Sequence, residues 1–139
     1  MCHNNIVIIS AHPDDMEIGM GGTVAKLVES KAVITSIAVT NGGRSSNPFA
    51  LTEQRIIEVR REEALRAASV LGVKEVIFYG EPDAAGEVNT TAVKRRLIEI
   101  LARLRPTEVY RWMRRVTDIQ PIVLSASWRG KACVKPASR

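Results

Sequence analysis

The residues most suited to chemistry lie in one short segment near the start of the chain, Ser10–Gly22. It reads SAHPDDMEIGMGG and brings one imidazole, three carboxylates and three glycines together directly after an apolar run. An imidazole and a carboxylate three residues apart can share one metal ion, and a carboxylate between them can act on water that the ion activates. The segment therefore predicts a metal centre that activates water.

His12 and Asp15 are the predicted metal ligands, because the rigid Pro13 between them restricts the loop so that both side chains can face one point. One nitrogen and one carboxylate oxygen suit zinc or another divalent ion. Asp14 is the predicted catalytic residue, a base that takes a proton from water and returns it to a leaving group. Glu17 could orient a ligand, or simply favour a helix N-terminus by about 0.3–1 kcal/mol.

Two other interpretations of this segment can be weighed against a metal centre. A lone His-x-x-Asp pair in a loop is usually structural, but the full string His-Pro-Asp-Asp-x-Glu-x-Gly-x-Gly-Gly favours function. A dinucleotide-binding loop is disfavoured because Gly19, Gly21 and Gly22 lack the G-x-G-x-x-G spacing. The neighbouring carboxylates would also repel a pyrophosphate.

Alternating strands and helices must position this segment. Continuous β-branched runs predict strands buried on both faces, and apolar residues at helical spacing predict the helices between them. The predicted strands are 5–10, 33–40, 75–79 and a fourth that begins at Thr107. The predicted helices are 21–30, 52–71 and 93–104, with Gly72 and Pro106 as stops and Thr90 or Thr91 capping the last.

This alternation predicts the fold class α/β, a Rossmann-like three-layer α/β/α sandwich with a mostly parallel sheet and a missing or altered C-terminal part. Ligands bind at the carboxyl ends of parallel strands. Polar clusters follow the first three strands there, at 12–17, 41–47 and 81–83. We therefore expect the site at that edge, and an open sheet edge beyond the fourth strand.

Length and composition favour one globular domain. The chain has 139 residues and 45% hydrophobic content, enough for a proper core. The apolar run 6–9 is too short to span a bilayer and no basic segment precedes it, so we expect no signal peptide, no membrane partner and a cytoplasmic location. Cys2 and Cys133 lack metal-ligand spacing and favour neither a disulfide scaffold nor a zinc ribbon.

The formal net charge of +5 is confined to one end of the chain. Residues 1–110 hold 13 Lys or Arg against 14 Asp or Glu, a net charge of −1, whereas residues 111–139 hold 7 against 1, a net charge of +6. The second segment has no helical or strand periodicity. We therefore divide the chain into residues 1–110 and a divergent basic tail, 111–139, and expect no nucleic-acid partner.

At His12-Pro13-Asp14-Asp15 and the glycines after it, the chain resembles the LmbE/PIG-L family of zinc-dependent N-acetylglucosaminyl de-N-acetylases. Residues 1–110 resemble the N-terminal part of such a deacetylase domain. The further matching segments are Thr40–Arg44, Arg60–Ala64, Leu71–Val73, Glu81–Asp83 and Arg105–Pro106.

This resemblance implies roles for particular residues. His12 and Asp15 would be metal ligands, and Asp14 both general base and general acid. The three residues that would contact the substrate are Arg60, Asp83, through sugar hydroxyls, and more weakly Arg44. The implied reaction is hydrolysis of the acetamide of a small N-acetylglucosaminyl substrate, which yields acetate and a free amino sugar.

Without the family, two of these residues have simpler explanations. Arg60 and Glu63 are three residues apart on a predicted helix and could form an ordinary surface ion pair. Asp83 follows Pro82, and a Pro-Asp pair is equally typical of a turn.

The chain departs from the family after the fourth strand, where the family completes its metal site with a histidine-rich motif. His3 is the only histidine besides His12, and the corresponding stretch, 117–123, reads TDIQPIV. The codons that can encode residues 118–123 can also encode His-Pro-Ala/Thr-His-Arg-Ala when they are read in another frame. One hypothesis is therefore a shift of the reading frame just after Tyr110. Loss of an oxyanion-stabilising imidazole would lower the rate by about 10² or more.

Two interpretations follow. The first is a metal-dependent de-N-acetylase that is impaired because the third histidine ligand is absent. The second is a noncatalytic metal- or sugar-binding protein whose basic tail mediates association. A homo-oligomer could lend a histidine across an interface, although no sequence feature requires one.

Overall fold

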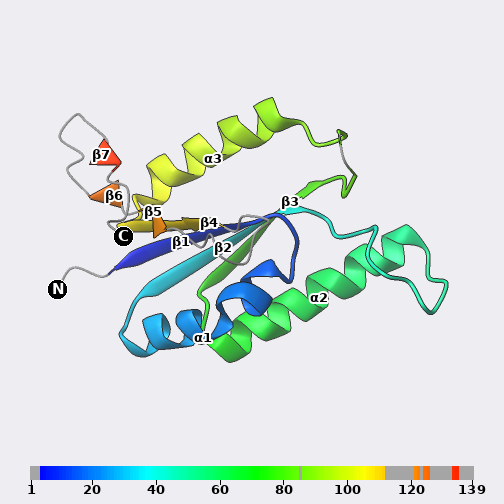
Figure 1. The fold of residues 1–139 in the computed structure, drawn as a ribbon, viewed down its shortest axis with the longest axis horizontal. Coiled ribbons are helices and arrows are strands. Elements are labelled where there is room, and N and C mark those ends of the chain that lie inside the picture. Colours follow the sequence, from blue (N-terminus) through cyan, green and yellow to red (C-terminus); the bar gives the residue numbers. More distant parts are fainter. Residues whose placement is uncertain (1–3, 85, 112–120, 123, 126–132, 135–139) are drawn as a thin grey trace.

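Strands and helices alternate along the chain as the sequence predicts (Figure 1). The structure, a computed structural model, describes residues 4–84, 86–111, 121–122, 124–125 and 133–134. The strands are β1 (Asn5–Ser10), β2 (Val33–Thr40), β3 (Glu75–Glu81), β4 (Glu108–Arg111), β5 (Pro121–Ile122), β6 (Leu124–Ser125) and β7 (Cys133–Val134). The helices are α1 (Asp15–Glu29), α2 (Glu53–Leu71) and α3 (Thr90–Leu104).

The first four strands form a parallel sheet in the order β3-β2-β1-β4. In the register, Ile6 of β1 lies between Ile34 of β2 and Glu108 of β4. The expectation of an open edge at the fourth strand is wrong, because β5 pairs antiparallel with β4 through Val109 and Ile122. The central position of β1 places the turn that follows it in the middle of the carboxyl edge of the sheet.

Helices cover both faces of this sheet, which confirms the α/β three-layer prediction (Figure 1). One buried cluster joins β1 and β2 to α1 through Ile8, Ile34 and Met20. The other joins the opposite face to α3 through Val7 and Val93. Strands β1 and β2 are apolar on both faces because both of these layers cover them.

Helix α1 begins at Asp15, six positions earlier than the predicted start at residue 21. The glycines at 19, 21 and 22 lower helix propensity, and this misled the prediction. Buried Met16 and Met20 anchor the additional turns on the sheet. Acidic residues also suit the first turn of a helix, where the macrodipole favours negative charge.

The other helices end close to their predicted bounds. The Thr52 side chain accepts a hydrogen bond from the Arg55 N–H at 3.3 Å and caps α2, which ends at the left-handed Gly72, as predicted. The prediction that Thr90 or Thr91 caps the last helix is wrong. Asn89 caps α3, and its side chain accepts from the Ala92 N–H at 3.0 Å.

Backbone hydrogen bonds tie the loops at the carboxyl edge to one another. The N–H and the hydroxyl of Thr40 donate to the Ala11 carbonyl at 2.7 and 2.9 Å, and the Asn41 N–H donates to the Glu81 carbonyl at 2.9 Å. The ends of three parallel strands are therefore fixed together, as the predicted site requires.

Two predictions concern other parts of the chain. In the described ranges, no helix combines the length and apolar character needed to cross a bilayer. The predicted frame shift and the altered character of the tail fall almost entirely on residues outside those ranges, and they stay predictions.

Candidate active site

The turn between β1 and α1 leaves the Asp14 carboxylate free for chemistry. Asp14 occupies the N-cap position of α1, yet its side chain forms no capping hydrogen bond. The carboxylate is half-exposed, and its Oδ2 lies 3.7 Å from an Arg60 guanidinium nitrogen. An aspartate at an N-cap usually stabilises the helix through its side chain, so an uncommitted carboxylate here suits a role in proton transfer.

His12 lies between two carboxylates, one from the first turn of α1 and one from the loop after β3. Its backbone N–H donates to Asp15 Oδ2 at 2.8 Å, and its ring Nδ1 lies 3.4 Å from the same oxygen. Its ring Nε2 lies 3.1 Å from Asp83 Oδ1. The structure thus brings together His12 and Asp15, which the sequence predicts as ligands, with Asp83, which is distant in sequence.

The candidate metal site can be tested against these donors. Asp15 and Asp83 are mostly buried, at 14% and 17% side-chain exposure, whereas the imidazole is 46% exposed and accessible to an incoming ion. His12 and Asp15 offer the nitrogen and oxygen donors that a divalent ion prefers. In the part of the chain that the structure describes, no group of three His, Cys, Asp or Glu side chains has the arrangement of a metal site. The donor types of His12 and Asp15 therefore fit two positions of a metal shell. The stretch in which the sequence predicts the absence of a third ligand, 117–123, lies mostly outside the described residues.

Arg60 of α2 reaches toward Asp14 and is held from two sides. Its Nε donates to Ser45 Oγ at 3.2 Å, and a terminal nitrogen donates to Glu63 Oε2 at 3.2 Å. The Ser45 hydroxyl in turn donates to the Gly42 carbonyl at 2.7 Å. The ion pair with Glu63 foreseen from the sequence is present, and the same guanidinium also approaches Asp14 in the turn between β1 and α1.

Gly42 lets the loop after β2 approach that turn. Its φ of +67° is a conformation that favours glycine, and a Cβ here would lie 3.1 Å from Pro13 Cδ. The Arg60 side chain lies on the same side, 3.7 Å from that position. A side chain at residue 42 would therefore push against both the turn and the arginine.

Arg44 forms its ion pair with the loop after β3. Its guanidinium is 3.6 Å from Glu87 Oε1, and both side chains are more than half exposed. The contact joins the loop after β2 to the loop after β3. Among the described residues, the charged partner of Arg44 is therefore Glu87 and not a carboxylate of the turn.

Glu17 is the least satisfied group of the turn. Burial raises the pKa of its carboxyl, and the nearby Asp14 and Asp15 charges raise that pKa further. Its Oε2 is buried without a hydrogen-bond partner among the described residues. The proximity of three carboxylates indicates a turn that favours a bound cation.

Sequence reasoning missed the contacts of Ser45 with Arg60 and of Glu87 with Arg44. Ser45 lies in a segment that reads as ordinary turn chemistry, and Glu87 lies in a polar loop. The one available signal was their position after β2 and β3, at the edge where the other site residues gather.

Comparisons with known proteins agree on one family. The model of the PIG-L family, described as GlcNAc-PI de-N-acetylase, matches residues 7–119. The diacetylchitobiose deacetylase of Thermococcus kodakarensis is 28% identical over 103 residues, which is 73% of this chain and 38% of that protein.

Solved structures give the same fold with more than one activity. The N,N'-diacetylchitobiose deacetylase of Pyrococcus horikoshii, in complex with its inhibitor MPG, has a TM-score of 0.71 and 29% identity, covering 76% of this chain and 39% of that one. GalB, the 4-carboxy-2-hydroxymuconate hydratase of Pseudomonas putida KT2440, has a TM-score of 0.69 and 26% identity, covering 76% of this chain and 45% of that one. The chain spans less than half the length of each of these relatives.

Proposed function

The chain belongs to the PIG-L family of GlcNAc-PI de-N-acetylases, and from this membership we propose that it hydrolyses the acetamide of an N-acetylglucosamine-type substrate. The single observation that carries the proposal is the turn after β1. There His12 and Asp15 lie within 3.4 Å of each other beside an Asp14 carboxylate that caps no helix. The products would be acetate and a free amino sugar.

We assign His12 and Asp15 as the residues that would hold a divalent ion, with zinc as the first choice. When bound, such an ion would polarise the amide carbonyl and lower the pKa of water. The side chains alone already provide a nitrogen and an oxygen donor on one accessible turn.

Asp14 carries the proton in the proposed reaction. Its carboxylate accepts a proton from the attacking water and then donates it to the amine nitrogen as the C–N bond breaks. The oxygen of the water leaves in acetate, and the proton leaves on the amino sugar. Arg60, held by Ser45 and Glu63, restrains the orientation of this carboxylate from the side.

The neighbouring polar side chains would bind the substrate. Asp83 lies on the far side of His12 from Asp15, where its free oxygen can accept from sugar hydroxyls. Arg60 remains the stronger cationic candidate, and Arg44 the weaker one because Glu87 already pairs with it. We expect a small N-acetylglucosaminyl molecule as the substrate.

We further propose that this 139-residue chain turns over slowly on its own. Catalytic zinc sites use three protein ligands, and we assign only His12 and Asp15 among the described residues. A histidine from a second copy of the chain could complete the shell. The comparisons do not favour the alternative of a noncatalytic binding protein with an associating tail.

Zinc titration and acetate release from N-acetylglucosamine and N,N'-diacetylchitobiose test the proposal together. We expect zinc to bind at micromolar or tighter levels and acetate to be released slowly. The variant Asp14→Asn should lower acetate release by about 10²–10⁴-fold, because it removes the general base, and should keep zinc affinity within a few-fold. Glu62→Gln, which removes an exposed charge of α2 that pairs with Arg66, is the matched control and should change neither.

Three results would contradict parts of this scheme. Rapid turnover by the unmodified chain would refute the impairment. Loss of zinc together with activity in Asp14→Asn would make Asp14 a ligand instead of a base. Addition of water to an unsaturated acid without acetate release would match the hydratase relative and overturn the proposed deacetylation.

A further inference from the structure

The loop between β3 and α3, residues 82–89, carries two side chains that contact other parts of the candidate site. Asp83 lies 3.1 Å from the His12 ring, and Glu87 pairs with Arg44. The described residues of this loop, 82–84 and 86–89, form neither helix nor strand. The position of Asp83 beside His12 therefore depends on how the two ends of the loop are fixed.

Glu81, the last residue of β3, joins these two ends. Its Oε2 accepts a hydrogen bond from the backbone N–H of Asn89 at 3.0 Å, and Asn89 is the residue that caps α3. Its backbone carbonyl accepts from the Asn41 N–H at 2.9 Å, in the loop after β2. The Glu81 side chain is only 14% exposed. One residue thus closes the loop that carries Asp83 and ties it to the neighbouring loop.

A bulge in β3 precedes Glu81. Phe78 pairs with Ala38 of β2, but Glu81 pairs with Thr40, so β3 has one more residue than β2 in this interval. A bulge bends its strand and redirects the side chains that follow, and bulges are frequent next to active sites. The direction in which the loop leaves the sheet is therefore set just before Glu81.

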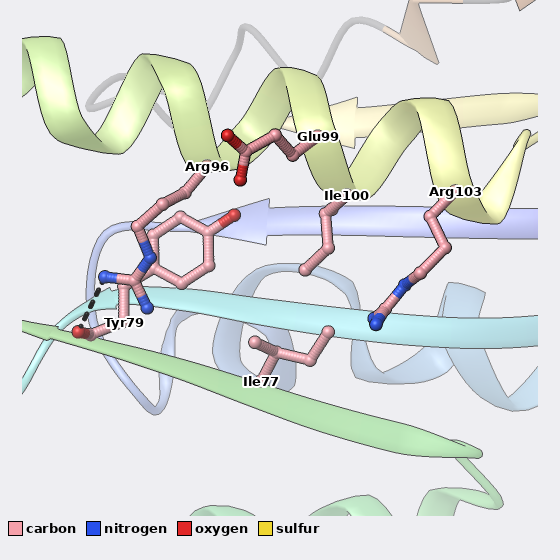
Figure 2. A pocket seen from close by; sticks show the side chains of 6 residues that line it. All are labelled: Ile77, Tyr79, Arg96, Glu99, Ile100 and Arg103. Carbon is pink, nitrogen blue, oxygen red and sulfur yellow. Dashed lines mark hydrogen bonds between the residues drawn. The ribbon is translucent and has the colours of Figure 1, made fainter.

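Arg96 of α3 holds this end of β3 from the other side. Its guanidinium donates to the Tyr79 carbonyl at 3.0 Å, and its carbon lies 3.9 Å from the centre of the Tyr79 ring (Figure 2). The same nitrogen lies 3.8 Å from Glu81 Oε1. Arginine suits this arrangement because its planar group can donate in several directions and stack on a ring at once.

The magnitude of the ion pair argues for a role in orientation. Arg96 is 40% exposed, and an ion pair at 3.8 Å with a partly exposed arginine contributes little to the free energy of unfolding. The pair nevertheless restrains a mostly buried carboxylate whose other oxygen bonds to the start of α3. Its main effect is therefore on the position of the loop.

We propose that Glu81 and Arg96 form a clamp that positions Asp83 beside His12. Neither residue touches a reacting atom, so both are positioning residues that act through the loop. The role of Asp83 in binding sugar hydroxyls rests on the proposed function, whereas its contact with His12 does not. A displacement of about 1 Å is enough to disrupt binding or catalysis at such a site.

The ring signals of His12 in NMR spectra test the clamp without any activity. The chain has only two histidines, so His12→Ala assigns these signals. In the metal-free, full-length chain at constant pH, Asp83→Asn should move them, because it changes the group beside the ring. Glu81→Ala and Arg96→Gln should move them in the same direction. Arg95→Gln is the matched control, since Arg95 neighbours Arg96 on α3 but pairs with the exposed Glu99.

Acetate release by the zinc-loaded chain tests the consequence for the reaction. Glu81→Ala and Arg96→Gln should each raise KM by about fivefold or more, because a hydrogen bond to substrate is weakened. The value of kcat and the zinc affinity should stay unchanged, since Asp83 contributes to substrate binding alone. The double variant should be little worse than Glu81→Ala, because both residues act through one loop.

The outcomes that overturn the clamp differ from those that overturn the proposed function. His12 signals that move in Asp83→Asn but in neither clamp variant would refute it, as would equal movement in Arg95→Gln. A fall in kcat with KM unchanged would show a merely structural role. If the signals move as expected and no variant or unmodified chain releases acetate, the clamp stands and the proposed deacetylation fails.

Discussion

The loops at the carboxyl edge of the sheet and the cavity between β3 and α3, which Tyr79 and Arg96 line, both hold charged side chains. They differ in how far their polar groups satisfy one another. In the loops, His12 contacts two carboxylates and Arg60 contacts three side chains, with Glu17 as the exception. In the cavity, the Tyr79 hydroxyl has no partner among the described residues. The comparison teaches that the side chains around His12 largely satisfy one another, whereas the α3 side of the sheet holds a buried hydroxyl that no described residue satisfies.

The largest expected effect concerns the ligand pair of the loops. The change His12→Ala removes one of two donors and should weaken zinc binding by at least about 100-fold, since the loss of even an outer-shell partner costs 10–100-fold. Competition with a chromogenic chelator measures it. Glu62→Gln, which removes an exposed charge of α2 that pairs with Arg66, is the control, and equal losses in both variants would refute the proposed site.

The second effect contrasts two glycines with positive φ. A Cβ at Gly42 would lie 3.1 Å from Pro13, whereas one at Gly80, next to the cavity-lining Tyr79, would have nothing within 4 Å. Gly80→Ala should cost about 1 kcal/mol of unfolding free energy from backbone strain alone. Gly42→Ala should cost about twice as much, because Pro13 must also move, and should weaken zinc binding.

Denaturant unfolding and zinc titration of both glycine variants make this measurement. Equal destabilisation, with zinc binding intact in each, would show that the loops are no more tightly organised than the cavity side.

The third effect separates the two tyrosines. The Tyr110 hydroxyl donates to Glu108 Oε2 at 2.7 Å, so Tyr110→Phe should cost about 0.5–1.5 kcal/mol of stability. Tyr79→Phe removes a hydroxyl with no partner and should be neutral or stabilising. Urea unfolding of both variants measures these changes in stability. A clear loss of stability in Tyr79→Phe would show that the Tyr79 hydroxyl is hydrogen-bonded in the unmodified chain.

The burial of Tyr110 and its bond to Glu108 raise the pKa of its phenol to about 12, from an ordinary value near 10. The folded chain therefore holds this proton more tightly than the unfolded chain does. Stability should fall as the pH rises from about 10 to 12, because the unfolded state loses its proton first. Tyr110→Phe should flatten that fall in alkaline unfolding curves, and an unchanged slope would contradict the shift.

The smallest effect concerns the support of Arg60. Ser45→Ala removes one hydrogen bond to Arg60 and its link to Gly42, so substrate turnover should fall only a few-fold while zinc binding is unchanged. A comparison of KM and kcat for acetate release measures it. If neither KM nor kcat changes, the contact with Glu63 is sufficient to hold Arg60 in place.

Much of the fold could be predicted, because it depends on local patterns. The continuous apolar runs of β1 and β2 gave the observed bounds, and Thr52 and Gly72 marked the ends of α2. The start of α1 could not be predicted, since its glycines oppose a helix and only the packing of Met16 and Met20 on the sheet supports one.

The sequence allowed us to predict that the candidate site residues lie near one another, but not their individual contacts. Three strands ending at one edge implied that the turn at 12–15 and Asp83 would meet. Arg44 pairs with Glu87 because of the paths that their two loops take, and the path of a loop leaves no periodic pattern in the sequence. The cavity was not predictable either, because Tyr79 reads as an ordinary strand residue.

The central place of β1 has a consequence for how the chain folds during synthesis. The Thr107 N–H donates to the Asn5 carbonyl at 2.7 Å, and this bond closes a loop of about a hundred residues between neighbouring strands. Such long-range pairing is slow, and one side of β1 stays uncovered until the region of β4 has left the ribosome. We therefore expect nascent chains whose β4 is still inside the ribosome to recruit chaperones at β1. We also expect the turn after β1 to be among the last parts to become protected from hydrogen exchange.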